Sequence, residues 1–484
     1  MIRALAAMFC FCCAAAGGFS QTRASDLTPE QVAAIDRFVN AEMQRERVPG
    51  LAVGIYSRGQ ILLAKGYGLS SVELDAGVRP ETVFQSGSVG KQFVSAAIMM
   101  LVEEGKVGLD DSIVKYFPDA PESWRNIRVK NLLSHTSGLA EYESEERTGP
   151  KGPFYLRLDF TEDELLKKAE ALPIEFKPGE KWDYRNTNYL LLGILIRRVT
   201  GTFYADYLQQ RIFRPLEMSS TRLISESDII PNRSSGYELK GEKLQNQTWV
   251  SPTFNSTADG ALYFNVLDLN KWDEALYGTK LLRQSSLDQM WTVFPLNDGK
   301  PNKDNYGFGW ALATVKGHKL EEHGGAWQGF TCHYLRYPDD AVSVAVLTNS
   351  DSARPEQFAH VIAGLVNPAL KLPQLEAIED KQPELARQLS AVLEQVASGK
   401  DIKDQLSPKL LEVWTPELVE RVTREVKAVW PSEALTLVSR KENEGLTMSR
   451  YRIRNGNETR LMIFGIAADG KIDTLWVGAD PDVR

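Results

Sequence analysis

The sequence has little cysteine, no excess of basic residues and no apolar run long enough to cross a membrane. Four of its 484 residues are cysteine, and three of them, Cys10, Cys12 and Cys13, lie close to the N-terminus. Cys332 stands alone in the rest of the chain, so no internal disulfide is expected there. The formal net charge of -8 argues against nucleic acid or an anionic membrane as a partner.

The first 24 residues have the pattern of a signal peptide. Arg3 provides a positive start, the apolar run 4–16 is too short to span a bilayer, and small residues follow it, with cleavage expected after Ser20 or Ala24. A buried N-terminal helix is the alternative, but a run made largely of cysteine and alanine offers little bulk for a core. The pattern predicts an exported bacterial protein, periplasmic or secreted, with no transmembrane segment in the mature chain.

The remaining chain has an ordinary globular composition, with 43% hydrophobic and 25% charged residues, and is long enough for two domains. Periodicity predicts helices over 31–47, 92–104 and 262–277, and it predicts strands over 51–57, 60–66, 318–322, 330–337 and 341–348. The central part is mostly helical. This order predicts an α+β fold, in which an antiparallel five-stranded sheet is flanked by helices and a helical subdomain lies beside it.

A second, smaller domain is expected at the C-terminus. Residues 369–376 contain a proline and few signals of regular structure, so we predict a linker between a domain over 25–368 and another over 377–484. In the latter, patterns typical of helices precede patterns typical of strands, which predicts a small α+β accessory domain. These expected elements are two helices, 383–398 and 416–429, and four strands, 435–440, 447–455, 459–467 and 471–477.

The stretch Phe84-Gln85-Ser86-Gly87-Ser88-Val89-Gly90-Lys91 leads directly into an apolar helix. A spacing of three places Ser88 and Lys91 on one helical face, where free backbone N–H groups surround the serine oxygen. A lysine in a partly buried pocket loses some of its preference for charge and can accept the serine proton. The pattern predicts a serine nucleophile with a lysine base; a capping serine followed by an exposed lysine is the plainer interpretation of this motif alone.

A second motif, Tyr184-Arg185-Asn186, follows a turn and precedes a predicted helix. A tyrosine hydroxyl beside a lysine ammonium is expected to lose its proton more easily, so Tyr184 would relay protons between Ser88 and the leaving group. Asn186 would hydrogen-bond both the lysine amine and a substrate amide. For this motif alone, a loop tyrosine that packs its ring is the plainer interpretation.

A third motif, His323-Gly324-Gly325, is expected at the end of a strand. Glycine lets a substrate backbone approach closely, and the N–H of Ala326 would form an oxyanion hole with that of Ser88. A bulge or turn with an incidental histidine is the alternative interpretation.

Together the three motifs, in this order, resemble those of the serine β-lactamase and penicillin-binding protein superfamily. The similarity is greatest to its branch of class C β-lactamases, D-aminopeptidases and family VIII esterases, which is peptidase S12-like. It covers roughly residues 27–368 and includes the segment Leu132-Leu133-Ser134-His135-Thr136-Ser137-Gly138-Leu139 and the segment Asp259-Gly260-Ala261-Leu262-Tyr263. The resemblance implies a β-lactamase/transpeptidase-like fold for this part, while the C-terminal domain resembles NTF2-like folds.

The resemblance also implies roles for the candidate residues. Ser88, Lys91 and Tyr184 would be catalytic, while Asn186, His323, Gly325 and Ala326 would bind substrate, the last through the oxyanion hole. His323 stands where many relatives carry lysine, and His135 is expected to be structural. A histidine with a pKa near ~6.5 is mostly neutral at about pH 7.5, which weakens the case for a substrate carboxylate.

These features predict an acyl-serine hydrolase acting on a D-amino-acid peptide or amide or on a small ester, without cofactor or metal. A β-lactamase or DD-carboxypeptidase remains an alternative, as does a penicillin-binding sensor that is acylated without turnover. The expected partner is a small-molecule or peptide substrate and not nucleic acid. The sequence does not indicate an oligomeric state.

Overall fold

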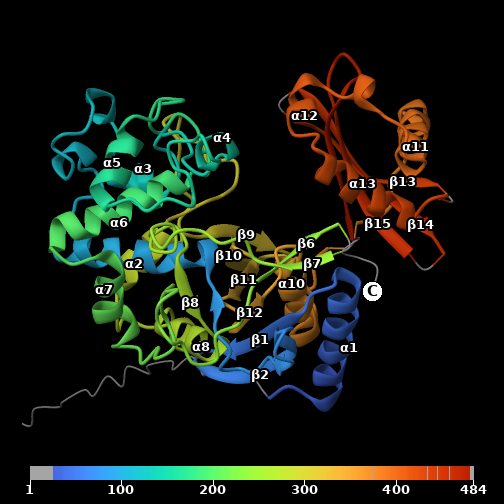
Figure 1. Cartoon of the computed structure of the whole chain (residues 1–484). Helices are drawn as coiled ribbons and strands as arrows, with labels where there is room; N and C mark the ends of the chain where they lie inside the picture. The colour runs from blue at the N-terminus through green and yellow to red at the C-terminus, as the bar shows by residue number, and fades with distance from the viewer. Residues whose placement is uncertain are drawn as a thin grey trace, which may run out of the picture.

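The computed structural model describes residues 26–479 except 242, 374, 433, 444 and 457. The expected signal segment, residues 1–24, lies outside these residues. The chain forms two parts, a large one around a seven-stranded sheet and a smaller C-terminal one around a four-stranded sheet (Figure 1). This is the predicted fold class. No helix among the described residues is long and apolar enough to cross a membrane.

The seven-stranded sheet joins both ends of the large part. Its order is β3-β2-β1-β12-β11-β10-β9, and every pairing in it is antiparallel. The five central strands are those that the sequence predicts, and β3 and β9 extend the two edges. The strands are β1 (Gly50–Ser57), β2 (Gln60–Ser71), β3 (Ala76–Gly77), β9 (Ala311–Val315), β10 (His318–Trp327), β11 (Phe330–Tyr337) and β12 (Val342–Thr348).

Strands β1 and β2 form a hairpin that turns at Arg58 and Gly59, both with positive φ, as a tight turn requires. Every residue of β1 is buried, because the sheet is covered on both faces. Helix α1 (Pro29–Glu46) contacts α10 (Pro355–Val366), which packs on β11 and β12, while α8 (Val266–Ala275) packs on the opposite face. Thr28 caps α1 through a capping box with Gln31.

Between β3 and β9 the chain forms the helical subdomain and five short strands. Its helices are α2 (Lys91–Glu103), α3 (Val129–Leu133), α4 (Glu145–Thr148), α5 (Glu162–Glu170), α6 (Asn186–Thr200), α7 (Tyr204–Leu208) and α9 (Gln284–Met290). A three-stranded sheet contains β4 (Phe84–Gln85), β8 (Leu262–Phe264) and β5 (Arg222–Leu223), and a hairpin contains β6 (Tyr237–Lys240) and β7 (Lys243–Asn246).

Strand β2 extends to Ser71 and not only to residue 66, and two further predicted boundaries are wrong. The helix expected over 262–277 begins only at Val266, because residues 262–264 pair with β4 and β5 as strand β8 and Asn265 then caps the helix. Strand β10 does not end at residue 322 but continues to Trp327, so the motif His323-Gly324-Gly325 lies within it. Pairing with β11 sustains the strand through both glycines.

The C-terminal part has its own apolar core, in which α11 and α13 pack against a meander of four strands. Its elements are α11 (Pro383–Ala397), α12 (Pro408–Glu412), α13 (Pro416–Ala428), β13 (Leu435–Asn443), β14 (Leu446–Asn455), β15 (Glu458–Ile466) and β16 (Ile472–Ala479).

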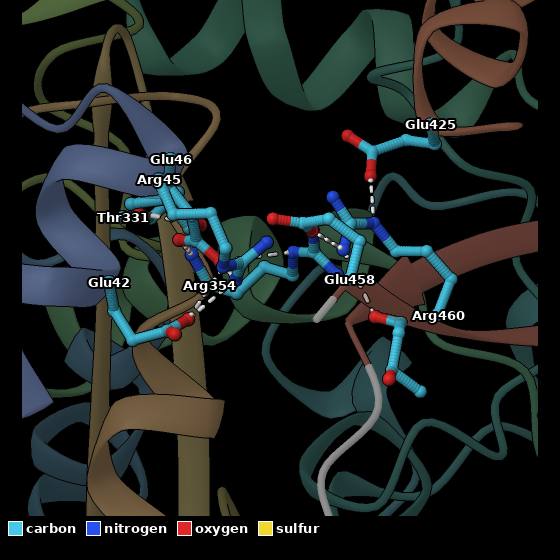
Figure 2. Close-up of polar contacts among 10 residues, drawn as sticks. Glu42, Arg45, Glu46, Thr331, Arg354, Glu425, Glu458 and Arg460 are labelled. Carbon is cyan, nitrogen blue, oxygen red and sulfur yellow. Dashed lines mark hydrogen bonds and ion pairs between the residues drawn. The ribbon is translucent and has the colours of Figure 1, made fainter. Parts of the chain in front are cut away.

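Polar residues dominate the junction of the two parts. Arg354 pairs with Glu46 in the large part, and Arg460 pairs with Glu425 and Glu458 in the small one (Figure 2). A cavity of about 1590 Å³ lies between the two parts. The Arg424 side chain reaches across the junction and donates a hydrogen bond to the carbonyl of Gly241. The junction therefore resembles a polar contact between domains more than a continuous core.

Candidate active site

Ser88 lies in a single 3-10 turn, Gly87–Gly90, directly before α2. This turn packs against β10. A Cβ on Gly87 would lie 2.3 Å from the backbone nitrogen of Ala326, and one on Gly325 would lie 2.2 Å from the carbonyl oxygen of Ser86. Both glycines are thus needed for the two backbones to approach, which brings Ser88 and Ala326 together as the sequence predicts.

The Lys91 side chain is buried and makes three hydrogen bonds. Its Nζ lies 2.8 Å from Ser88 Oγ and 2.8 Å from Asn186 Oδ1, and it donates to the carbonyl of Asp259. Burial lowers the pKa of Lys91 to about 8, although the nearby Asp259 and Glu143 oppose this shift. An amine with such a pKa is partly neutral near pH 8, so it can accept a proton from the serine hydroxyl.

Tyr184 lies beside this pair, with Lys91 Nζ 5.0 Å from the centre of its ring. Burial raises the pKa of its hydroxyl, and the contact with Ser88 only opposes that rise. Within the described part of the chain, this hydroxyl makes no hydrogen bond of ordinary geometry. The expectation that proximity to lysine eases proton loss from Tyr184 is therefore wrong, because burial and the charges of nearby acids, Asp259 among them, raise its pKa. Lys91 is the better base.

His135 packs against the Tyr184 ring and accepts a hydrogen bond from the backbone of the same loop. Its ring centre is 4.2 Å from that of Tyr184, and its Nδ1 accepts a hydrogen bond from the backbone N–H of Arg185 at 3.2 Å. Burial, together with the charge of Lys91, holds the pKa of His135 well below its usual range. The neutral imidazole of His135, which is hydrogen-bonded to the backbone of Arg185, thus holds the Tyr184 ring in position.

His323 is also buried, and both of its ring nitrogens have protein partners. Nδ1 lies 2.6 Å from the carbonyl oxygen of Gly324, so it donates there, and Nε2 accepts from the Tyr306 hydroxyl at 2.8 Å. Burial lowers the pKa of His323 to about 3, and the Lys91 charge adds to this shift. This pKa lies below the value near 6.5 expected for a histidine. His323 therefore stays neutral at physiological pH and offers no cation to a substrate carboxylate.

Sequence reasoning missed a group of acids around Lys91 and Asn186. Glu141 accepts from the backbone N–H of Asn186 at 2.6 Å, and Glu143 accepts from its side-chain amide at 2.5 Å. The Asp259 carboxylate accepts from the Tyr142 hydroxyl at 2.6 Å. The sequence did contain a signal, because Glu141 and Glu143 lie shortly after the motif segment that ends at Leu139.

Glu143 also contributes to a small cavity of about 30 Å³ beside the nucleophile, which is lined in part by Ser88, Asn186, Ala326 and Trp327. Burial raises the pKa of Glu143 to about 8, and the charges of Asp259 and Glu141 raise it further. The site therefore combines a serine, a lysine with a lowered pKa, the backbone of Ala326 close to the serine turn, and a carboxyl group that lines the same cavity as Ser88. This combination suits acyl transfer.

Comparison with known proteins agrees with this chemistry. The family profile described as Beta-lactamase matches residues 35–365. Protein flp of Staphylococcus aureus is 28% identical over 349 residues, which is 70% of this chain and 68% of the relative. Penicillin-binding protein 4* of Bacillus subtilis is 27% identical, over 60% of this chain and 66% of the relative.

Solved structures share the fold. The octameric penicillin-binding protein homologue from Pyrococcus abyssi covers 92% of this chain and 99% of its own, with a TM-score of 0.63 and 23% identity. The D-stereospecific amidohydrolase from a Streptomyces species covers 69% of this chain and 98% of its own, with a TM-score of 0.58 and 26% identity. The first of these similarities extends through the C-terminal part.

Proposed function

The chain belongs to the beta-lactamase family, a family of acyl-serine hydrolases, and within it we propose that the protein hydrolyses amides or short peptides of D-amino acids. The observation that carries the catalytic proposal is the 2.8 Å contact between Lys91 Nζ and Ser88 Oγ. The choice of substrate is supported by the Glu143 carboxyl group in the pocket and by the similarity to a D-stereospecific amidohydrolase.

In the first step, neutral Lys91 accepts the hydroxyl proton of Ser88 while Ser88 Oγ bonds to the substrate carbonyl carbon. The carbonyl oxygen becomes an oxyanion, which the backbone N–H groups of Ser88 and Ala326 stabilise. Asn186 holds Lys91 through the 2.8 Å hydrogen bond and keeps its amine directed at Ser88. Removal of one such oxyanion donor typically slows the reaction by about 10²–10³-fold.

In the second step, the leaving amine takes a proton as the C–N bond breaks, and Tyr184 relays this proton from the Lys91 ammonium. A tyrosine with a raised pKa suits this role, because it passes one proton on as it receives another and remains neutral overall. A water molecule then attacks the acyl-serine with Lys91 as base, which releases the acid and restores Ser88.

Glu143 favours a substrate with a free amino group. In the free enzyme, burial and neighbouring carboxylates disfavour its charge; a substrate ammonium would provide the missing counter-ion. A substrate carboxylate would instead meet acids and a neutral His323, so the pocket disfavours the DD-carboxypeptidase and β-lactamase alternatives. Small esters without an amino group would be poorer substrates.

A hydrolysis panel tests the proposal. We expect turnover of D-alanine p-nitroanilide, less turnover of its N-acetyl derivative, and little turnover of the L-enantiomer or of a chromogenic cephalosporin. Ser88→Ala should abolish all activity, and mass spectrometry should locate the acyl group on Ser88. Glu143→Gln should raise KM for the free-amine substrate about tenfold or more while changing that for a butyrate ester little.

Stable acylation by a labelled penicillin without turnover of any substrate in this panel would support the sensor alternative instead. Efficient cephalosporin hydrolysis would contradict the proposed substrate class.

A further inference from the structure

Three potential metal ligands converge on the face of the large sheet opposite Ser88. They are Glu322 of β10, His333 of β11 and His360 of α10. Successive residues of a strand point to opposite faces, so Glu322 faces α10 whereas His323 faces the active site. We propose that these three side chains bind a divalent transition-metal ion of the Zn²⁺ type. This inference is independent of the proposed function.

The distances between the ligand atoms are close to those of a metal site. Glu322 Oε2 lies 2.9 Å from His333 Nε2 and 3.0 Å from His360 Nε2. All three ligand atoms lie within 4.8 Å of one another. In tetrahedral zinc sites with bonds of about 2.0–2.1 Å, neighbouring ligand atoms are about 3.3 Å apart. The two carboxylate–imidazole distances therefore need to increase by only a few tenths of an ångström for an ion to replace the hydrogen-bonding protons, and the two imidazole nitrogens lie no more than 4.8 Å apart.

The ligand types select the class of ion. Two imidazoles and one carboxylate are a donor set that suits Zn²⁺ and related ions such as Co²⁺, with a fourth position open to water. Ca²⁺ and Mg²⁺ prefer sites made of oxygen ligands only.

The surrounding structure holds the ligands in place. All three belong to regular elements, and the side chains of His333 and His360 are only 6% and 8% exposed. Gly324 makes room for one of the imidazoles, since a Cβ there would lie 3.3 Å from His333 Nδ1. The Glu322 side chain is 17% exposed, which leaves an ion a route to the cluster from solvent.

A bound ion would join β10 to α10 one residue away from His323. It would stabilise the folded protein by mass action, because the three ligands lie together only in the native chain. It would not touch Ser88 or Lys91, so the chemistry proposed above does not pass through it.

Cobalt binding provides a direct test. Full-length protein without an affinity tag is prepared with Cys10, Cys12 and Cys13 replaced by serine, so that these thiols cannot bind metal. The metal-free protein is titrated with Co²⁺, followed by its visible d–d absorption, and then with Zn²⁺ as competitor. The variants are Glu322→Gln and His360→Gln. The matched control is His318→Gln, because His318 also lies in β10 and pairs with a carboxylate, Asp340, at 2.8 Å.

We expect one equivalent of Co²⁺, its displacement by Zn²⁺, and a rise in melting temperature with either ion. Glu322→Gln and His360→Gln should weaken binding at least tenfold and remove the rise, whereas the control should behave as the parent protein. Circular dichroism without metal establishes that each variant is folded. The proposal is overturned if the parent protein binds no stoichiometric Co²⁺ or Zn²⁺. It is also overturned if folded His360→Gln or Glu322→Gln binds as tightly as the parent.

Discussion

At the scale of single residues, the chemistry depends on the proton of Lys91. The pKa of this amine is lowered to about 8, mainly because its burial disfavours the charged form. The neighbouring Asp259, Glu143 and Glu141 restore part of the preference for charge. Sequence spacing predicts the pairing of Ser88 and Lys91, but it cannot predict the balance between burial and these acids, because the acids come from segments far from Lys91 in the sequence.

This balance predicts a pH profile. The neutral fraction of an amine with pKa about 8 rises from about 9% at pH 7 to about 91% at pH 9. For a substrate that does not ionise, such as a nitrophenyl ester, kcat/KM should therefore rise about tenfold over this interval and level off above pH 9. Stopped-flow measurement of acylation at constant ionic strength gives the profile. A rate that keeps rising beyond pH 10 would indicate an unperturbed lysine.

Glu143→Gln provides the control for that profile. Since the Glu143 carboxylate raises the pKa of Lys91, its removal should move the midpoint to lower pH. A shift to higher pH would contradict the assignment of the rising limb to Lys91.

Lys91 and Tyr184 should act as one unit. Lys91→Ala and Tyr184→Phe should each lower kcat by about 10²–10⁴-fold, the usual contribution of general acid–base catalysis. The double variant should lose little more than either single variant, because each removes the same proton path. The measurement is a double-mutant cycle on kcat. Losses that multiply would indicate that the two side chains work separately.

At the scale of elements, the active site depends on the close approach of the Ser88 turn and strand β10. Gly325→Ala introduces a Cβ that would lie 2.2 Å from the Ser86 carbonyl oxygen and 2.9 Å from the Ser88 nitrogen. Because both contacts are with backbone, the turn must move and the oxyanion hole opens. We expect acylation to slow by about 10²-fold or more, as when an oxyanion donor is lost.

Gly278→Ala is the matched control for this substitution, since a Cβ at Gly278 meets nothing within 4 Å. Its acylation rate should equal that of the parent protein. If Gly325→Ala also leaves that rate unchanged, the approach of the two backbones is not needed for catalysis.

The helices and strands also differ in how well the sequence predicts them. Strands β1, β11 and β12 and helix α1 follow from local patterns, because each element is long and strongly periodic. The short strand β8 could not be predicted, since its three residues become a strand only through partners distant in the sequence. In the site, local motifs predict that Ser88, Lys91 and Asn186 come together. They do not predict that the Tyr306 hydroxyl forms a hydrogen bond with His323 Nε2.

At the scale of the whole molecule, the large part should fold without the C-terminal part. Each has its own core, and the junction is polar. Leu370 is fully buried in the core of the large part. A truncation must therefore lie beyond Leu370 and not at Val366, where α10 ends. A chain that ends at residue 373 should remain folded by circular dichroism and should still be acylated at Ser88 at a rate within a few-fold of the full chain.

A truncation at residue 366 is the comparison, because it removes Leu370 and should lower the melting temperature. Aggregation of the longer truncated chain, with loss of acylation, would show instead that the two parts depend on each other.

The pairing of β1 with β12 also has a consequence for the order of events during synthesis. Leu51 lies opposite Thr348 in the middle of the sheet, so the first strand to be synthesised cannot pair until the last strand of the large part has been synthesised. Contacts between segments so distant in sequence slow folding. A ribosome must release almost the whole of this part before the sheet can close, and until then the nascent chain remains in a state that can still be threaded through a narrow pore.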